Sequence, residues 1–455
     1  MAALAVLDIG KTNAKLVVLD GQGRCLAERR RPNRVLDAPP FPHYDIDGLW
    51  TWLLDELAAA AKQYRITRLV TTTHGACAAL VDEAGLVLPV LDYEYRGPEE
   101  IATDYPRDAA EFALSGSPAL PAGLNLGRQL FWLRQRFPEE FARARHILMY
   151  PQYWAWRLCG FVAGEVASLG CHTDLWHPGH ARYSGLTTAQ GWDRLMPPLR
   201  PAWEALGRIL PQIALGTGLP PDCEVISGIH DSNASLLPHL ASRDAGQRFT
   251  VVSTGTWVIA AAIGAPLQRL NEQRDMLANV DARGTPVACA RFMGGREFET
   301  LNRGGARDCA DSDIDEALRA GVLALPAFAE TGGPFMGKPG RIEGSLPEGA
   351  GAAYALASLY CALLTDHCLD ALGSEGDIVV EGSFIANRHY LGLLAALRPA
   401  QAVHVSADAA GTVGGARILA DWGQAHAPST HAVKPLTHPL LEGYRVRWSE
   451  RARQN

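Results

Sequence analysis

The hydrophobic pattern of the first part of the chain predicts a strand meander followed by a helix and a further strand. Apolar runs with β-branched residues flank a short polar turn at residues 10–13, and a second turn follows at residues 21–23. The predicted elements are strands within residues 4–20, a strand at 25–30, a helix over 47–64 with Asp47 as its N-cap, and a strand at 67–73. This alternation is typical of an α/β domain.

A similar strand–turn–strand pattern returns about 245 residues later, in residues 249–263. Helical and strand periodicity breaks between Leu240 and Arg248, so we expect two domains, residues 1–243 and 244–455, with a separate tail from about residue 425. The second half then predicts a long amphipathic helix at 352–372, a strand at 377–381, a turn leading into a helix at 382–397, and a strand at 403–405. A chance likeness between two glycine turns is the alternative to a duplicated architecture.

Composition narrows the class of protein. The chain has 455 residues, 47% of them hydrophobic, and its net charge of −7 argues against a nucleic-acid partner. Its apolar stretches are shorter than the roughly 20 residues that span a bilayer, and no basic leader precedes them, so we expect no membrane partner and a cytoplasmic location. Nine cysteines without a Cys-x-x-Cys pair favour reduced thiols, and neither they nor the histidines show metal-ligand spacing.

The turn after the first strand carries candidate phosphate chemistry. Asp8 ends a buried strand, where a carboxylate is costly without a positive partner such as magnesium. Behind it, Thr12, Asn13, two lysines and the turn's backbone N–H groups suit a polyphosphate. An ordinary hairpin with an aspartate at its turn is the alternative.

Residues 253–256, Ser-Thr-Gly-Thr, offer similar groups in the second half of the chain. Glycine permits close backbone approach, and the flanking hydroxyls can donate to phosphate oxygens. Serine, threonine and glycine are common in turns, so this segment alone is a weak signal. The signal is stronger when this segment is taken together with the turn at residues 10–13, because two such turns could hold a nucleotide in a cleft that closes.

Asp231 is the candidate base. It follows a strand that ends in Gly228, and it opens a helix that runs toward Leu240. The sequence leaves two interpretations: Asp231 caps this helix, or it accepts the proton of a substrate hydroxyl during phosphoryl transfer.

With these segments in this order, the chain resembles the FGGY carbohydrate kinases, relatives of hexokinase, actin and the chaperone ATPases. The segments that carry the resemblance are residues 8–15, 228–231, 253–257, 381–387 and 412–416. The resemblance implies an α/β fold of two duplicated ribonuclease-H-like domains of the actin/hexokinase type with an interdomain cleft. It further implies a sugar site and the catalytic Asp231 in the first domain, a nucleotide site in the second, and ATP and Mg²⁺ as cofactors.

Site residues follow from the same resemblance. Those expected at the nucleotide are Asp8, which would also hold the metal, Thr12, Asn13, Lys15, Thr254, Gly255, Thr256, Gly382, Asn387, Gly414 and Gly415. Those expected at the sugar are His74, Gly75, Glu94, Arg96, His172, Asp174, His230 and Asp231. Two departures from the family pattern stand out: Ser383 replaces a glycine of the adenosine motif, and Glu94 replaces the aspartate of a Trp-x-Asp-x-Arg sugar motif.

The substrate signals are mixed. Residues 73–76 resemble xylulokinases, whereas residues 230–232 and 253–257 resemble rhamnulokinases. We therefore expect phosphorylation of a small ketose, with a lean to a 6-deoxyhexulose such as L-rhamnulose or L-fuculose over a pentulose such as xylulose. A polyol kinase of the glycerol or erythritol type, and a non-kinase ATPase like actin or the chaperones, are the alternatives. The expected partner is the small-molecule sugar, with a homodimer as a possible assembly.

Overall fold

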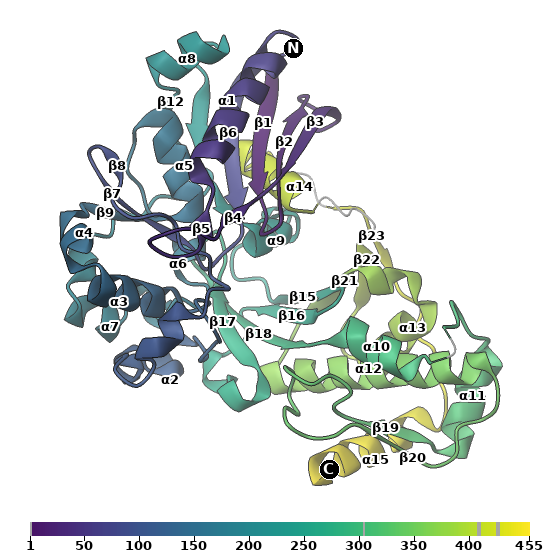
Figure 1. Cartoon of the computed structure of the whole chain (residues 1–455). Coiled ribbons are helices and arrows are strands. Elements are labelled where there is room, and N and C mark those ends of the chain that lie inside the picture. The colour runs from purple at the N-terminus through teal and green to yellow at the C-terminus, as the bar shows by residue number, and fades with distance from the viewer. Residues whose placement is uncertain (1, 304, 407–410, 425–427) are drawn as a thin grey trace. The chain divides into compact units, whose positions relative to one another are not determined.

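The chain forms two compact units, each with its own sheet and core. The computed structural model describes residues 2–303, 305–406, 411–424 and 428–455. Unit 1 comprises the chain up to Asp244, Ala278–Pro286 and the described part of 410–427, and unit 2 comprises Ala245–Leu277, Val287–Ala409 and the C-terminal segment from Pro428 (Figure 1). The first long segment ends close to the predicted boundary, but two later segments assigned by sequence to the second domain pack with unit 1.

The sheet of unit 1 has the strand order β12-β13-β6-β1-β2-β3. Strand β1 is antiparallel to β2 and parallel to β6, which places Asp8 opposite Lys15 on one side and Thr72 on the other. The strands are β1 (Ala2–Ile9), β2 (Asn13–Leu19), β3 (Cys25–Pro32), β6 (Arg65–Thr73), β12 (Ala205–Arg208) and β13 (Glu224–Ile226), with β14 (Ile229–His230) pairing β6 at its end.

Helices cover both faces of this sheet, because successive side chains of a strand point to opposite sides. On one face, Ala5 and Leu7 of β1 pack with α1 (Ile46–Ala61) and α5 (Tyr150–Cys159). On the other, Leu4 and Val6 pack with α9 (Asp231–Ala241) and α14 (Gly411–Ala420), whose yellow ribbon lies beside the purple strands in Figure 1. Strand β1 is therefore buried on both sides.

The cap of helix α1 differs from the sequence prediction. The helix begins at Ile46, and Asp45 is its N-cap, with Asp45 Oδ1 accepting the backbone N–H of Gly48 at 2.9 Å. Asp47 lies in the first turn, where a negative side chain favours the helix dipole. The prediction missed the cap by two residues because both positions offer an aspartate.

The middle of unit 1 adds a smaller lobe after β6. It contains a three-stranded sheet and helices around a separate apolar cluster that includes Trp132 and Trp192. Its main elements are β7 (Ala78–Asp82), β8 (Gly85–Leu86), β9 (His146–Met149), α3 (Leu126–Arg136), α4 (Pro138–Arg143) and α7 (Gly185–Ala189).

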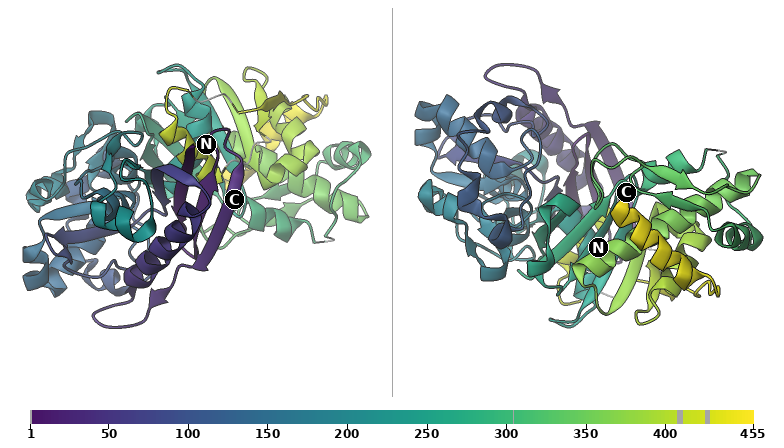
Figure 2. Two further views of the ribbon diagram at one scale, coloured as in Figure 1. Left: turned by 90° about the horizontal axis from the view of Figure 1, so that it is seen from above. Right: turned by 90° about the horizontal axis from the view of Figure 1, so that it is seen from below.

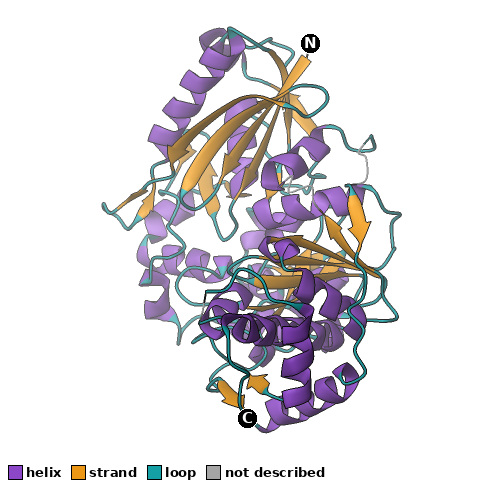
Figure 3. Cartoon of the chain, turned by 90° about the vertical axis from the view of Figure 1, so that its right-hand side faces the viewer, coloured by secondary structure: helices purple, strands orange, loops and turns teal. Residues whose placement is uncertain are grey.

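The sheet of unit 2 repeats the topology of unit 1. Its order is β17-β18-β16-β15-β21-β22-β23, in which β15 is antiparallel to β16 and parallel to β21, as β1 is to β2 and β6. The strands are β15 (Phe249–Thr254), β16 (Val258–Ile263), β17 (Met276–Val280), β18 (Pro286–Phe292), β21 (Asp377–Gly382), β22 (Val403–Ser406) and β23 (Thr430–Ala432). The two sheets, orange in Figure 3, confirm the predicted duplicated α/β fold.

Helix α12 (Ala350–Leu372) lies at the centre of the unit 2 core. The sequence predicted an amphipathic helix here, and that prediction is wrong. The helix is buried on nearly all sides, against α11 (Asp311–Ala320), α13 (Arg388–Leu397) and the sheet. By length and composition it could cross a membrane, but 89% of its apolar window is buried within the fold. A helix that is apolar all round belongs to a core of this kind.

The C-terminal tail also belongs to this core. Helix α15 (Leu441–Gln454) buries Tyr444 and Trp448 against unit 2, and Figure 2 (right) shows it in yellow along the green elements. Trp448 Nε1 donates to Ala324 O at 2.7 Å. The predicted start of the tail, residues 425–427, lies outside the described residues.

Candidate active site

Asp8 lies where β1 ends, and its side chain is only 7% exposed. Its Oδ2 atom accepts from Thr412 Oγ1 at 2.8 Å and lies 3.5 Å from Lys15 Nζ. The burial comes from the two neighbouring strands, and the partners come from β2 and α14. The structure thus brings together the predicted metal ligand Asp8 and the predicted phosphate contact Lys15.

The turn between β1 and β2 presents its polar side chains to solvent. Gly10 N donates to Asn13 O at 2.9 Å, which closes the turn. Thr12 and Asn13 are exposed, and Asn13 Nδ2 donates to Thr12 Oγ1 at 3.1 Å. Both side chains are therefore accessible to a ligand, as the sequence predicts for a phosphate contact.

Lys11, in the same turn, is directed away from it into a polar and aromatic cluster. Its ammonium bonds Asp92, lies 3.2 Å from Glu94 Oε2, and lies 4.8 Å from the ring centre of Tyr93. Asp92 also accepts from Tyr44 OH at 3.3 Å. The sequence placed Lys11 with Lys15 among the groups that suit a polyphosphate, and it gave Asp92 no contact of its own. The signal in the sequence was a lysine next to Gly10 in the predicted phosphate turn. Only the fold shows in which direction this lysine side chain points.

Asp231 is the first residue of α9, and His230 is the N-cap. Asp231 Oδ1 accepts from the backbone N–H of Ser232 at 2.6 Å and lies 3.2 Å from His230 Nε2. Burial raises the pKa of Asp231 to about 6, while the adjacent His74 lowers it and Asp8 raises it. Asp231 is therefore the first helical residue and not the N-cap, although its Oδ1 atom accepts the N–H group of Ser232 in the first turn.

Two buried histidines adjoin this aspartate. Burial lowers the pKa of both His74 and His230 to about 4, so both are neutral near pH 7. His74 lies among the rings of Tyr44, Tyr93 and Tyr150, and its Nε2 atom has no hydrogen-bond partner among the residues that the structure describes. A buried, unpartnered ring nitrogen is costly, so it is a candidate contact for a bound hydroxyl.

Two glycines make this arrangement possible. A Cβ on Gly75 would lie 2.7 Å from His230 Nε2, so the histidine ring occupies the space that a side chain would take. Gly228 has φ +83°, and a Cβ there would lie 2.2 Å from Thr71 O. The predicted residues His74, Gly75, His230 and Asp231 therefore form one site.

Other predicted sugar contacts are not part of this cluster. Glu94 reaches it through Lys11, but Arg96 is largely exposed and bonds Glu99 at 2.8 Å. Asp174 is buried and accepts from Tyr105 OH at 2.8 Å and Asn125 Nδ2 at 3.2 Å, while His172 Nδ1 contacts Leu124 O at 3.0 Å. Their bonding partners within the smaller lobe give Asp174 and His172 an architectural role.

In unit 2, Ser253 and Thr254 end β15, and residues 255–257 form the turn to β16. Thr254 is buried: its Oγ1 atom donates to Glu381 O at 2.6 Å and accepts from Phe384 N at 2.9 Å. Gly382 has φ +89°, and a Cβ there would lie 2.0 Å from Thr254 O. Thr254 and Gly382 thus fix this end of the sheet, whereas Gly255 and the exposed Thr256 stay accessible.

Two predicted nucleotide contacts have packing roles. Asn387 is the N-cap of α13, where its side chain accepts from Tyr390 N at 2.9 Å and donates to Ser358 Oγ at 2.9 Å. Gly415, on α14 of unit 1, is buried, and a Cβ there would lie 1.8 Å from Ala234 O of α9. Gly414 precedes it on the same helix and is partly exposed.

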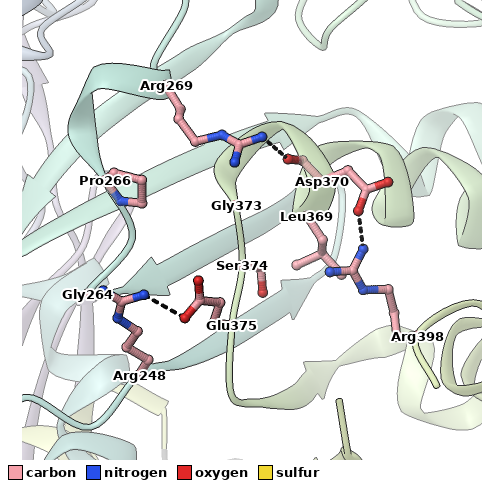
Figure 4. A pocket seen from close by; sticks show the side chains of 10 residues that line it. All are labelled: Arg248, Gly264, Pro266, Arg269, Leu369, Asp370, Gly373, Ser374, Glu375 and Arg398. Atoms are coloured by element: carbon pink, nitrogen blue, oxygen red, sulfur yellow. Dashed lines mark hydrogen bonds and ion pairs between the residues drawn. The ribbon is translucent and has the colours of Figure 1, made fainter. Parts of the chain in front are cut away.

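A pocket of about 540 Å³ opens elsewhere in unit 2. It lies at the start of β15 and β21, the opposite strand end from residues 253–256. Figure 4 shows its arginines in contact with other pocket residues: Arg248 with Glu375 at 2.5 Å, Arg269 with Asp370 O at 3.0 Å, and Arg398 with the Asp370 carboxylate. This pocket is separate from the predicted nucleotide residues.

Two domain families match the chain. The N-terminal domain of the FGGY family of carbohydrate kinases matches residues 3–238, and the FGGY carbohydrate kinase C-terminal domain matches residues 246–428. The chain belongs to the FGGY family of carbohydrate kinases. Both FGGY domains are present in the family's order, in agreement with the duplicated fold.

Individual relatives support this membership. The FGGY chain is 25% identical to the L-fuculokinase of Escherichia coli K12 over 270 residues, 56% of this chain and 55% of that protein. The chain thus spans about half the length of the curated relatives it matches. A solved carbohydrate kinase from Novosphingobium aromaticivorans is 39% identical, with a TM-score of 0.92 over 99% of this chain and 98% of that one. The xylulose kinase of Rhodospirillum rubrum, 17% identical with a TM-score of 0.78 over 99% and 98% of the two chains, shows the fold alone.

Proposed function

We propose that this FGGY protein is an ATP-dependent sugar kinase that phosphorylates a hydroxyl of a small ketose, with Asp231 as the catalytic base. The observation that carries the proposal is the position of Asp231: its side chain is 29% exposed, so a substrate can reach it, and it lies next to the neutral His230 and His74.

In the proposed reaction, the substrate hydroxyl oxygen forms a bond to the γ-phosphorus of ATP as the bond to the ADP oxygen breaks. The hydroxyl proton passes to Asp231. The raised pKa of Asp231 brings this carboxylate closer to the operating pH, which favours proton transfer. Most of the acceleration comes from alignment and charge neutralisation, as in phosphoryl transfer generally.

The residues around Asp8 fit a magnesium ion bound with ATP. Mg²⁺ prefers one or two carboxylates with several waters, and Asp8 is a buried carboxylate whose two protein contacts both involve Oδ2. Bound magnesium would supply positive charge to the phosphates. Lys15, Thr12 and Asn13 would contact phosphate oxygens. The interdomain cleft expected for the nucleotide stays a prediction.

The sugar is proposed to bind at the His74 and Lys11 cluster. His74 Nε2 offers an unpartnered nitrogen, Glu94 is partly accessible, and the Tyr93 ring adds an apolar face. The similarity to L-fuculokinases supports a 6-deoxyhexulose over a pentulose. The proposal therefore favours L-fuculose or L-rhamnulose as the ketose.

The test is ADP release by the purified protein with Mg-ATP across 6-deoxyhexuloses, pentuloses, glycerol and erythritol. Strong stimulation by one ketose is expected. Stimulation by a polyol alone, or ATP hydrolysis that no sugar changes, would contradict the ketose kinase.

Asp231→Asn is expected to lower the transfer rate by roughly 10²–10⁴-fold, because the proton acceptor is lost, while ATP affinity is retained. The measurements are single-turnover phosphorylation and calorimetric ATP binding. Asp222→Asn is the matched control: it removes an exposed carboxylate of the same unit that has only a 4.0 Å contact with Arg65. Asp231→Asn activity equal to that of the control would exclude Asp231 as the base.

A further inference from the structure

An aspartate, a cysteine and a histidine from two distant parts of the chain meet at the edge of unit 2. Asp308 and Cys309 precede helix α11, and His389 is the second residue of α13. The Cys309 Sγ and His389 Nδ1 atoms are 3.3 Å apart, and Asp308 Oδ1 lies 3.5 Å from the same nitrogen. One ligand atom from each residue lies within 4.8 Å of the other two.

The two separations from His389 Nδ1 match the edges of a metal coordination shell. With bonds of about 2.3 Å to sulfur and about 2.0–2.1 Å to nitrogen and oxygen at tetrahedral angles, neighbouring ligand atoms lie about 3.3–3.6 Å apart. Both observed distances to His389 Nδ1 fall in this range. A single ion could therefore contact all three side chains after small adjustments.

The second nitrogen of His389 is held in the way that orients a metal ligand. His389 Nε2 lies 3.0 Å from Asp311 Oδ1, and the same oxygen accepts from Arg388 Nη1 at 2.7 Å. A carboxylate at Nε2 fixes the hydrogen there and leaves the Nδ1 lone pair facing Cys309 and Asp308. Metal-binding histidines commonly donate their other N–H group to a carboxylate.

The burial of these three side chains is that of a binding site that is open to solvent on one side. The His389 side chain is fully buried and Cys309 is 7% exposed, whereas 61% of the Asp308 side chain is exposed. An ion could enter past Asp308, and water could complete its coordination. Cysteine and histidine favour Zn²⁺ and similar transition metals over Mg²⁺, which prefers oxygen ligands.

We propose that Asp308, Cys309 and His389 bind a transition-metal ion of the Zn²⁺ type, with Asp311 as the positioning residue behind His389. The bound ion would join the segment before α11 to the start of α13. Helix α13 follows residues 381–387, the predicted adenosine segment, so the metal would stabilise the C-terminal end of that segment. A thiol hydrogen bond from Cys309 to His389, without a metal, is the competing explanation.

The test is titration of the reduced, metal-free full-length protein with Co²⁺, followed by absorption spectroscopy. One equivalent is expected to give a thiolate-to-cobalt charge-transfer band in the near ultraviolet and the visible bands of tetrahedral cobalt. Cys309→Ser should abolish the charge-transfer band. Cys25→Ser, which removes an exposed thiol of unit 1, is the control and should keep it. Absence of the band in the wild type, or its persistence in Cys309→Ser, would overturn the site.

Two exposed positions keep the test independent of folding defects at the buried cysteine. Asp308→Asn should weaken cobalt binding through loss of a ligand. Asp311→Asn should weaken it by roughly 10–100-fold, the usual effect of removing a group that orients a metal-bound histidine. Circular dichroism checks that both variants are folded. Wild-type affinity in folded Asp308→Asn would exclude the proposed ligand set, and wild-type affinity in Asp311→Asn would exclude the positioning role.

Discussion

At the scale of single residues, the environment of each side chain separates candidate chemistry from packing. Asp231 and Asp174 are both carboxylates in predicted substrate segments. Asp174 has its oxygens occupied by Tyr105 and Asn125, while Asp231 bonds its own neighbour Ser232 and contacts His230. A satisfied buried carboxylate stabilises the fold, so we assign the base role to Asp231 alone.

The pKa of Asp231 predicts the pH dependence of transfer. A base must be ionised, and burial raises this pKa to about 6, so the protonated, inactive form accumulates as pH falls below that value. We expect kcat/KM to fall about tenfold per pH unit below pH 6 and to be level near pH 7. The pKa values of His74 and His230 are lowered, so these histidines add no change near neutrality.

The measurement is kcat/KM from pH 5 to 8 with the activating ketose. ATP affinity measured over the same range separates protonation of the base from loss of nucleotide. A rate that stays constant down to pH 5 would contradict a base with this pKa.

Gly75 is predicted to be intolerant of a side chain. In Gly75→Ala the new Cβ would lie 2.7 Å from His230 Nε2, so the histidine must move, at a cost of roughly 1–3 kcal/mol typical of overpacking. We expect lower thermal stability and a higher KM for the sugar. Gly216→Ala is the control, because this helical glycine has no atom near the added methyl group and alanine favours helix. Equal effects of the two substitutions would exclude a specific role for the Gly75–His230 contact.

At the scale of elements, the close approach of α9 and α14 supports both Asp231 and Asp8. Helix α9 begins with Asp231, and α14 supplies Thr412 to the Asp8 carboxylate. Gly415 lets the two helices touch through Ala234 O. Gly415, which the sequence predicts at the nucleotide, thus has a role in helix packing.

Gly415→Ala is therefore expected to push these helices apart. A Cβ 1.8 Å from a backbone oxygen cannot be relieved by a side-chain rotation, so we expect a loss of more than about 2 kcal/mol in unfolding free energy, together with weaker Mg-ATP binding. Chemical denaturation and calorimetry measure the two effects. The control is Gly443→Ala in α15, where no atom lies near the added methyl. A Gly415→Ala variant as stable as this control would contradict the proposed helix contact.

At the scale of the whole molecule, unit 1 is assembled from three separate parts of the chain. Arg283 of the segment 278–286 donates to Leu240 O at 2.8 Å and lies over the Trp422 ring, which stacks on Trp203 with 4.2 Å between ring centroids. Leu419 of α14 completes the apolar cluster beside β1. Unit 1 is therefore incomplete without residues far along the sequence.

A fragment of residues 1–244 is accordingly expected to fold poorly. It lacks Ala282, Ala416 and Leu419 of this cluster, so apolar surface of β1 and α9 becomes exposed. We expect binding of a hydrophobic dye and a broad thermal transition, compared with the full-length protein as the control. A sharp transition at the full-length melting temperature would show that the later segments are dispensable.

The sequence by itself determined the local and repeated features of this protein. Apolar periodicity located β1, β2, α1 and the β15–β16 hairpin, and the ordered motifs led to the FGGY fold. These features are encoded over short windows, because strand and helix periods act between near neighbours. Asp8 and Asp231 were singled out in this way, since each lies at the end of a strand or the start of a helix, whereas His74 was named from the family resemblance.

Only the tertiary structure decided which residues face one another. The direction of Lys11, the packing role of Gly415 and the cluster of Asp308, Cys309 and His389 all depend on contacts between distant segments. Cys309 and His389 are 80 residues apart, so no spacing pattern in the sequence could pair them. The burial that makes α12 a core helix has the same origin, because burial is set by the elements that surround a segment.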